Sequence, residues 1–156
     1  MAERWMPASD HDMVVMRTLH AIRALSDAMD RMHGGMKGDM GMNITDLATL
    51  RMLIIREQRE QAVSPHDIAE HLRISSASTT KLLDRLVASG YVTRQPHPSD
   101  RRSRVVELTD RSRQEFFAHF GEYLRLMRQV ATPYSQEELQ VISQFMGELS
   151  EAIDPA

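Results

Sequence analysis

Residues 64–109 constrain the fold of this chain more than any other stretch. Ser64, Pro65 and Asp67 are typical of a helix start, because the hydroxyl caps the first turn and proline fits its first position. A three-residue turn at 73–75 separates this short helix from a second one, which Ser75 caps and Gly90 ends. Strands are expected at 91–94 and 103–108, joined by a turn with prolines. The pattern predicts a helix-turn-helix followed by a β-hairpin.

An amphipathic helix is predicted before this segment, with Ser9 or Asp10 as its cap. Apolar residues recur there every three or four positions from Val15 to Met32. Residues 33–43 hold four glycines without periodicity, which indicates a loop. Thr45 can cap a further helix that continues to about position 58. The long first stripe is as consistent with a dimer interface as with packing in one core.

Two more amphipathic helices are expected after Thr109. Thr109 and Asp110 can cap the first of them, and Pro133 ends it. Ser135 and Glu138 form a capping box for the second. The fold class that follows from these patterns is mainly α with a small β-hairpin.

The composition limits the classes of function. The 156 residues suit one domain, and the absence of cysteine excludes disulfides, thiolate metal sites and thiol redox sensing. The N-terminus lacks the layout of a signal peptide, and no apolar run approaches the roughly 18 residues of a membrane helix. We therefore expect a soluble, cytoplasmic protein that does not enter a membrane.

The charge is unevenly distributed along the chain. The formal net charge is −3. Residues 73–104 contain seven basic and two acidic side chains, a charge of +5, so the remainder carries −8. A basic segment on an acidic body can still dock on a polyanion in one orientation, because the local field steers the encounter.

The second helix of the pair offers a polar face that suits a DNA groove. Hydroxyl groups and cations of this kind bind base edges or phosphate oxygens in the major groove. The alternative is an ordinary solvated helix face, and Thr79 also fits the apolar side of the helix. The candidate contacts on this helix are Ser75, Ser76, Ser78, Thr79, Thr80, Lys81 and Arg85, with Arg94 on the strand that follows.

Arginines gather at the tip of the predicted hairpin, as Arg101, Arg102 and Arg104 beside Asp100. A projecting arginine gains from the concentrated negative potential of a narrow minor groove. Asp100 can hold one arginine through a charge-assisted hydrogen bond and so orient the tip. A solubilising turn is the alternative. The combination of helix-turn-helix and arginine-tipped hairpin favours double-stranded DNA as the partner.

Residues 64–109 resemble the winged helix-turn-helix of the MarR family of bacterial transcription regulators. The strongest match is the segment DRRSRVVELT at 100–109, which is similar to the D-x-R…L-T pattern of the family's wing. The segment LDRL at 83–86, followed by GYV at 90–92, resembles the end of its recognition helix and its first wing strand.

This resemblance implies a single MarR-like domain over residues 1–156. Residues 45–109 would form the winged DNA-binding lobe, and residues 9–33 and 110–154 the dimerisation helices. It further implies a homodimeric repressor on a pseudo-palindromic operator, with residues 75–89 in the major groove and the arginine tip in the adjacent minor groove. Release by a small aromatic or phenolic effector is also implied, although no effector site can be assigned.

Other classes of function have weaker support in the sequence. His66 and Glu70 share a helix face, but no two of the seven histidines have that spacing and zinc needs three or four ligands. No phosphate loop, nucleophile elbow or carboxylate pair is present, so we expect no enzyme and no cofactor. The remaining alternatives are a winged-helix module for protein interaction and a DNA-binding activator that needs no effector.

Overall fold

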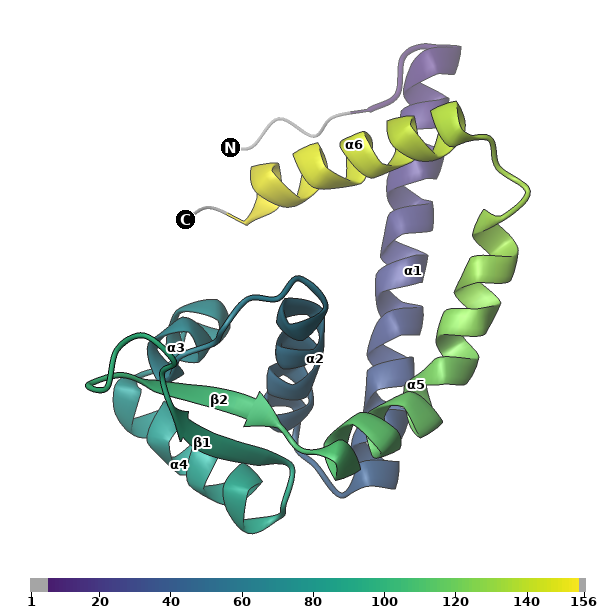
Figure 1. Ribbon diagram of the computed structural model, residues 1–156. Helices are drawn as coiled ribbons and strands as arrows, with labels where there is room; N and C mark the ends of the chain where they lie inside the picture. Colours follow the sequence, from purple (N-terminus) through teal and green to yellow (C-terminus); the bar gives the residue numbers. More distant parts are fainter. Residues whose placement is uncertain (1–5, 155–156) are drawn as a thin grey trace. The chain divides into compact units, whose positions relative to one another are not determined.

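The computed structural model describes residues 6–154, and it confirms the predicted fold class (Figure 1). Helices make up most of this part, and two antiparallel strands form its sheet. Contacts divide the chain into two compact units, Met1–Glu115 and Phe116–Ala156. The elements in order are α1 Asp10–Met40, α2 Ile44–Gln58, α3 Pro65–Leu72, α4 Ser76–Ala88, β1 Val92–Pro96, β2 Arg104–Leu108, α5 Asp110–Ala131 and α6 Gln136–Ile153.

Most helix starts lie where the sequence predicted them. Ser64 and Ser135 cap α3 and α6 in capping boxes with the third helical residue, and Ser75 caps α4. Ser9 is the cap of α1. The predicted cap of α2 is wrong, because Asn43 takes this role and the Thr45 hydroxyl donates to Asn43 Oδ1 at 2.7 Å.

The loop predicted at 33–43 is wrong for residues 33–40, because α1 continues through three of the four glycines to Met40, and only residues 41–43 form a connection. Met36 and Met40 lie one turn apart and are buried, at 2% and 7% exposure. Their burial offsets the low helix propensity of glycine. The helix ends at Gly41, whose φ of 64° is the left-handed conformation that favours glycine.

The core of the first unit lies between α2, α3, α4 and the hairpin, where Leu50, Ile68, Leu83, Leu86 and Val92 are almost fully buried. The α3–α4 turn is closed by the Ile74 amide, which donates to the Ala69 carbonyl at 3.0 Å. The predicted termination of α4 is confirmed at Gly90, with φ 76°.

The hairpin of β1 and β2 forms the wing, defined here as residues 92–108. Val92 pairs with Leu108 and Pro96 with Arg104, so each strand begins one residue later than predicted. Within β2, the Val106 amide donates to the carbonyl of Val63 at 2.8 Å. This bond ties the wing to the segment between α2 and α3.

The second unit consists of the rest of α5 and α6, separated near Pro133 as predicted. The rings of Phe116 and Phe120, one turn apart on α5, lie with centroids 5.3 Å apart. No side chain of α6 is fully buried. Across residues 6–154, the helices lack an apolar stretch long enough to span a bilayer.

Candidate nucleic-acid interface

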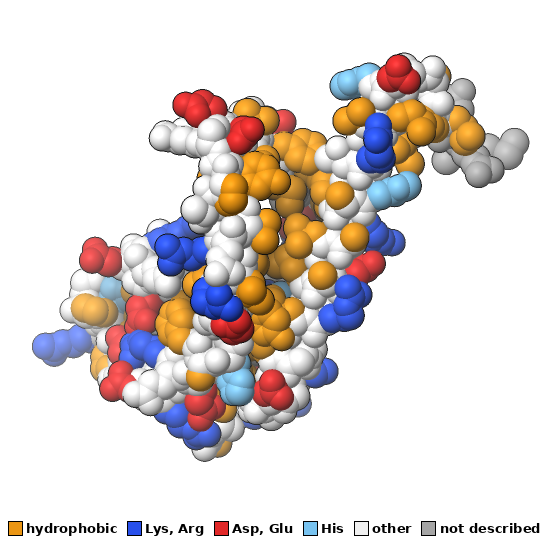
Figure 2. Space-filling model, turned by 90° about the vertical axis from the view of Figure 1, so that its right-hand side faces the viewer, with side chains coloured by type: hydrophobic (Ala, Val, Ile, Leu, Met, Phe, Trp, Pro, Cys, Tyr) orange, Lys and Arg blue, Asp and Glu red, His pale blue; other side chains and the backbone are white. Residues whose placement is uncertain are grey.

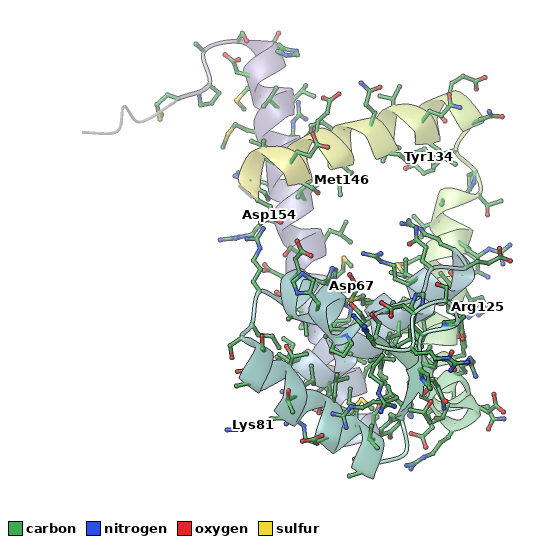
Figure 3. All side chains as sticks on the ribbon, turned by 60° about the vertical axis from the view of Figure 1, so that its left-hand side comes forward. Asp67, Lys81, Arg125, Tyr134, Met146 and Asp154 are labelled. Carbon is green, nitrogen blue, oxygen red and sulfur yellow. The ribbon has the colours of Figure 1, made fainter. Side chains whose placement is uncertain are left out.

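The N-terminal half of α4 presents a row of small polar side chains. Ser76, Ser78, Thr80 and Lys81 are all exposed. The Ser75 hydroxyl donates to Ser78 Oγ at 3.0 Å, and the Thr80 hydroxyl donates to the Ser76 carbonyl at 3.0 Å. Lys81 extends away from the helix (Figure 3). These hydroxyls and the ammonium group are the types of group that contact base edges and phosphates.

Thr79 does not belong to this row, although the sequence made it a candidate DNA contact. Its side chain is only 2% exposed, and its hydroxyl donates to the carbonyl of Ser75 at 2.9 Å. The residue packs on the apolar side of α4, where its spacing from Leu82 and Leu83 also placed it. Its hydroxyl is therefore already hydrogen-bonded within α4 and its cap, and it does not face solvent.

Two of the predicted cationic contacts are held by carboxylates. Arg85 donates to both oxygens of Asp46 on α2, with the shortest distance 2.7 Å from Nη2 to Oδ1. These hydrogen bonds raise the pKa of Arg85 above its ordinary value. Arg94 on β1 donates to Asp84 Oδ1 at 2.6 Å. Both arginines are thus engaged within the lobe.

The wing tip has an ordered turn built on Asp100. Its carboxylate accepts from the backbone amide of Arg102 at 3.0 Å and from the hydroxyl of Ser103 at 3.0 Å. These hydrogen bonds hold the pKa of Asp100 below its usual value. The sequence expected Asp100 to hold an arginine side chain, and this is wrong because its partners are a backbone amide and a serine.

The arginine side chains of the tip remain available for a ligand. Arg101, Arg102 and Arg104 lie at or beside the exposed turn. Within residues 6–154, no carboxylate forms an ion pair with any of these three or with Lys81. The unit therefore carries exposed cations at the wing tip and on α4, while the charges of Arg85 and Arg94 are neutralised.

A cluster that was not predicted from the sequence joins the base of the wing to α5. The Tyr91 hydroxyl donates to Glu115 Oε2 at 2.6 Å, and Arg111 donates to the carbonyl of Ser89 at 2.6 Å. Burial first, and the neighbouring Glu115 second, raise the pKa of Tyr91. The only local signal for it is the i, i+4 spacing of Arg111 and Glu115.

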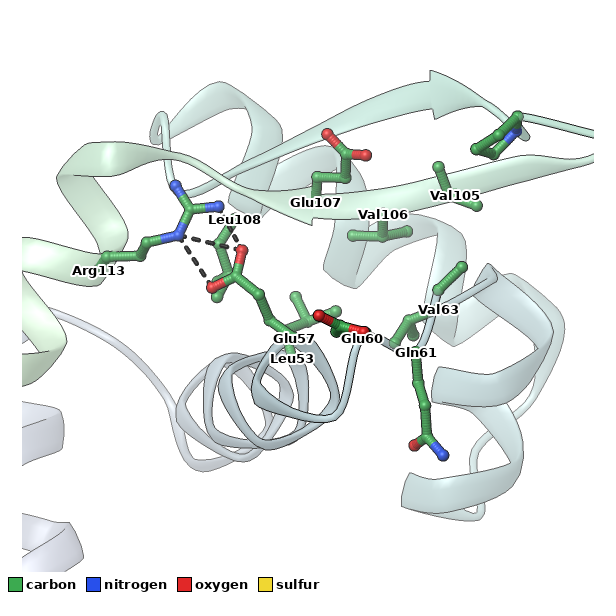
Figure 4. Close-up of a pocket in the computed structure, with 12 residues that line it drawn as sticks. Leu53, Glu57, Glu60, Gln61, Val63, Val105, Val106, Glu107, Leu108 and Arg113 are labelled. Atoms are coloured by element: carbon green, nitrogen blue, oxygen red, sulfur yellow. Dashed lines mark hydrogen bonds and ion pairs between the residues drawn. The ribbon is translucent and has the colours of Figure 1, made fainter.

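A cavity of about 320 Å³ lies behind β2 (Figure 4). Its apolar lining includes Leu53, Val63 and Val106, which are buried. Arg113 of α5 and Glu57 of α2 form an ion pair at its edge, and Arg113 holds the pKa of Glu57 below its usual value. The volume lies in the range of small-molecule sites.

Metal chemistry has little geometric support in this structure. Among residues 6–154, no three histidine, aspartate or glutamate side chains lie close enough together to hold an ion. His66 and Glu70 lie 3.9 Å apart on the exposed face of α3, as their spacing predicted. Two side chains do not complete a zinc site.

Comparisons with known proteins agree with this geometry. A model of the MarR family matches residues 40–103. The HTH-type transcriptional regulator PecS of Dickeya dadantii is 32% identical over 136 residues, which cover 86% of this chain and 79% of PecS.

Solved structures show the same fold at low sequence identity. A point mutant of MepR from a multidrug-resistant S. aureus clinical isolate has a TM-score of 0.71 at 17% identity, covering 88% of this chain and 97% of that one. The S. aureus MepR–DNA complex has a TM-score of 0.58, also at 17% identity, covering 86% of this chain and 98% of that one.

Proposed function

Because the chain belongs to the MarR family of transcriptional regulators, we propose that it is a homodimeric repressor of a pseudo-palindromic operator, released by a small-molecule effector. The site of action is the cytoplasm, where bacterial DNA is accessible. In this proposal, α4 enters the major groove and the wing tip reaches the adjacent minor groove. The contacts in the major groove come from Ser75, Ser76, Ser78, Thr80 and Lys81. The contacts in the minor groove come from Arg101, Arg102 and Arg104.

One observation carries the DNA-binding part of the proposal. Lys81 on α4 and three arginines on the wing, Arg101, Arg102 and Arg104, belong to one unit, are exposed and form no ion pair with a carboxylate of residues 6–154. A protein-interaction module would have no need to leave several arginines unpaired on a projecting turn. A polyanion supplies the missing charges, and a groove supplies acceptors for the hydroxyl row.

Exposed apolar surface supports the homodimer. The apolar stripe of α6 includes Val141, Ile142, Phe145 and Met146, and none of these is buried. In the space-filling view, hydrophobic side chains also gather along α1 (Figure 2). Contiguous apolar surface of this kind is characteristic of protein interfaces. A second copy of the chain would cover both surfaces.

The cavity behind β2 supports control by a small molecule. A ligand of aromatic or phenolic size fits its volume, and its walls include both the wing strand and the pair of Glu57 with Arg113. Occupancy would shift β2 and with it the arginine tip. The alternative within the same family is a DNA-binding activator that responds to no effector.

The experiment that tests the proposal is selection of bound duplexes from a random pool, with and without candidate aromatic compounds. We expect recovery of a pseudo-palindromic sequence with half-sites about one helical turn apart, and binding that weakens steeply as salt rises. Sedimentation of the free protein should give a dimer. A monomer that binds no duplex even in dilute buffer contradicts the proposal and favours the protein-interaction module.

A further inference from the structure

Arg85 lies on α4, but its guanidinium is directed at α2. Nη2 lies 2.7 Å from Asp46 Oδ1, and Nε lies 3.2 and 3.3 Å from the two carboxylate oxygens. This is the two-point geometry that arginine forms with a carboxylate and that lysine cannot reproduce. The Asp46 side chain is 7% exposed, while that of Arg85 is 45% exposed. The pair therefore neutralises a buried anion at the start of α2.

The same carboxylate also caps α2. Asp46 accepts from the Asn43 amide at 3.3 Å, and the Asn43 side chain accepts from the Asp46 amide at 2.9 Å. Gly41, which ends α1, lies two residues before Asn43. One side chain thus fixes the first turn of α2 and binds α4, 39 residues later in the chain.

Asp84, the residue before Arg85, forms a second ion pair between α4 and another element; together with the Arg85–Asp46 pair it is called the clamp on α4. It accepts from Arg94 of β1 at 2.6 Å, so adjacent residues of α4 are bound to different elements. The C-terminal half of α4 is held at α2 and at the wing. The N-terminal half carries the exposed Ser76, Ser78 and Lys81.

We propose that Arg85 is a positioning residue, which sets the orientation of α4 through Asp46 and supports DNA binding without contacting DNA. The inference rests on the proposed function. If Arg85 turned to a phosphate, it would leave the buried Asp46 without a counter-ion. An uncompensated buried charge costs more than an exposed ionic contact returns.

The test compares Arg85→Gln, Arg85→Lys, Asp46→Asn and the double variant Asp46→Asn/Arg85→Gln with the wild type. Dissociation constants are measured for the selected operator and for an unrelated duplex between about 50 and 200 mM salt. Each single variant should lower the ratio of operator to unrelated affinity by about tenfold, and the double variant should lower it no further. Asn at position 46 still accepts the amide of Asn43, so the cap of α2 is retained.

The salt dependence separates positioning from contact. Arg85→Gln should leave the slope of log affinity against log salt unchanged, whereas Lys81→Ala, the matched control on the exposed face, should reduce it by about one. Full affinity in Arg85→Lys overturns the proposal, because the two-point geometry with Asp46 would then not be needed. A slope reduced by about one in Arg85→Gln also overturns it, because the charge at position 85 would then contact a phosphate.

Amide hydrogen exchange in the free protein tests the clamp without DNA. Arg85→Gln and Asp46→Asn should each speed exchange at residues 82–88 by about tenfold, and Lys81→Ala should not. Unchanged exchange in both variants overturns the clamp. If the wild type binds no duplex, the proposed function fails, and the exchange rates still decide whether Arg85 orders α4 through Asp46.

Discussion

The hydroxyl of Tyr91 lies 2.6 Å from Oε2 of Glu115, and this hydrogen bond joins the base of the wing to the first turns of α5. Arg111 reinforces the contact, because its guanidinium carbon lies 4.8 Å from the centre of the tyrosine ring and its Nε donates to Glu115 at 2.9 Å. Gly90 precedes Tyr91 and follows the last turn of α4. The cluster therefore fixes the end of α4 against the beginning of α5.

Tyr91→Phe should lower the free energy of unfolding by about 1 kcal/mol, because it removes a hydrogen bond to a charged but partly exposed acceptor. Urea denaturation at neutral pH and fixed protein concentration measures the loss. Tyr134→Phe is the matched control, since Tyr134 is exposed on the segment before α6. Equal effects of the two substitutions would show that the Glu115 contact contributes nothing.

Arg102→Ala should weaken operator binding by about 1–3 kcal/mol at fixed salt if the side chain makes a specific groove contact. The backbone amide of Arg102 still bonds to Asp100, so the turn is preserved. Fluorescence anisotropy with a labelled operator measures the change. Arg59→Ala, at the end of α2, serves as the control for a simple loss of charge. Unchanged affinity in Arg102→Ala would contradict the role of the wing.

Asp100→Ala should weaken operator binding, although it removes a negative charge from the face proposed to meet DNA. Charge alone predicts tighter binding. The geometry predicts the opposite, because Asp100 accepts from the Arg102 amide and the Ser103 hydroxyl and so shapes the tip. Titration of operator into both proteins at the same salt gives the sign. Tighter binding by the variant would mean that the tip needs no fixed shape.

His33→Gln should reduce the loss of stability that the wild type shows between about pH 7.5 and 5. Burial first, and then the charge of Arg51, whose Nη1 lies 2.8 Å from His33 Nε2, hold the pKa of this histidine below 6.5 in the folded state. Protonation therefore favours the unfolded chain. The stabilising contribution is complete above the unfolded pKa and is lost as pH falls through the lower folded value.

Urea midpoints at the two pH values measure this effect of His33. His71→Gln, at an exposed position in the last turn of α3, is the control. If the wild-type midpoint falls no further than that of His33→Gln between the two pH values, protonation of His33 is not the cause of the loss of stability.

Gly34→Ala and Gly35→Ala should each raise the free energy of unfolding by about 0.5–1 kcal/mol. Both positions are helical, and an added Cβ would meet no atom within 4 Å. Gly41→Ala is the opposite case, because its φ of 64° strains any residue with a side chain. Thermal unfolding compares the three. Destabilisation by the first two would mean that the glycines of α1 serve a purpose other than helix formation.

The sequence identified those elements whose signals are local. The cap residues Ser64, Ser75 and Ser135 mark helix starts because their hydroxyls bond to amides three residues away. Gly90 marks a helix end because it adopts a positive φ at little cost. The wing pattern at 100–109 likewise identified the family. Each of these signals lies within about ten residues of chain.

The tertiary structure alone decided which side chains pair with one another and which residues with weak local signals are buried. The glycine-containing end of α1 is helical because Met36 and Met40 are buried, which no feature of residues 33–43 reveals. Arg85 is bound to Asp46, 39 residues away, because packing places the start of α2 beside α4. A local hydrogen bond needs only the backbone between its partners, whereas a long-range pair forms only after the whole lobe has fixed both ends in space.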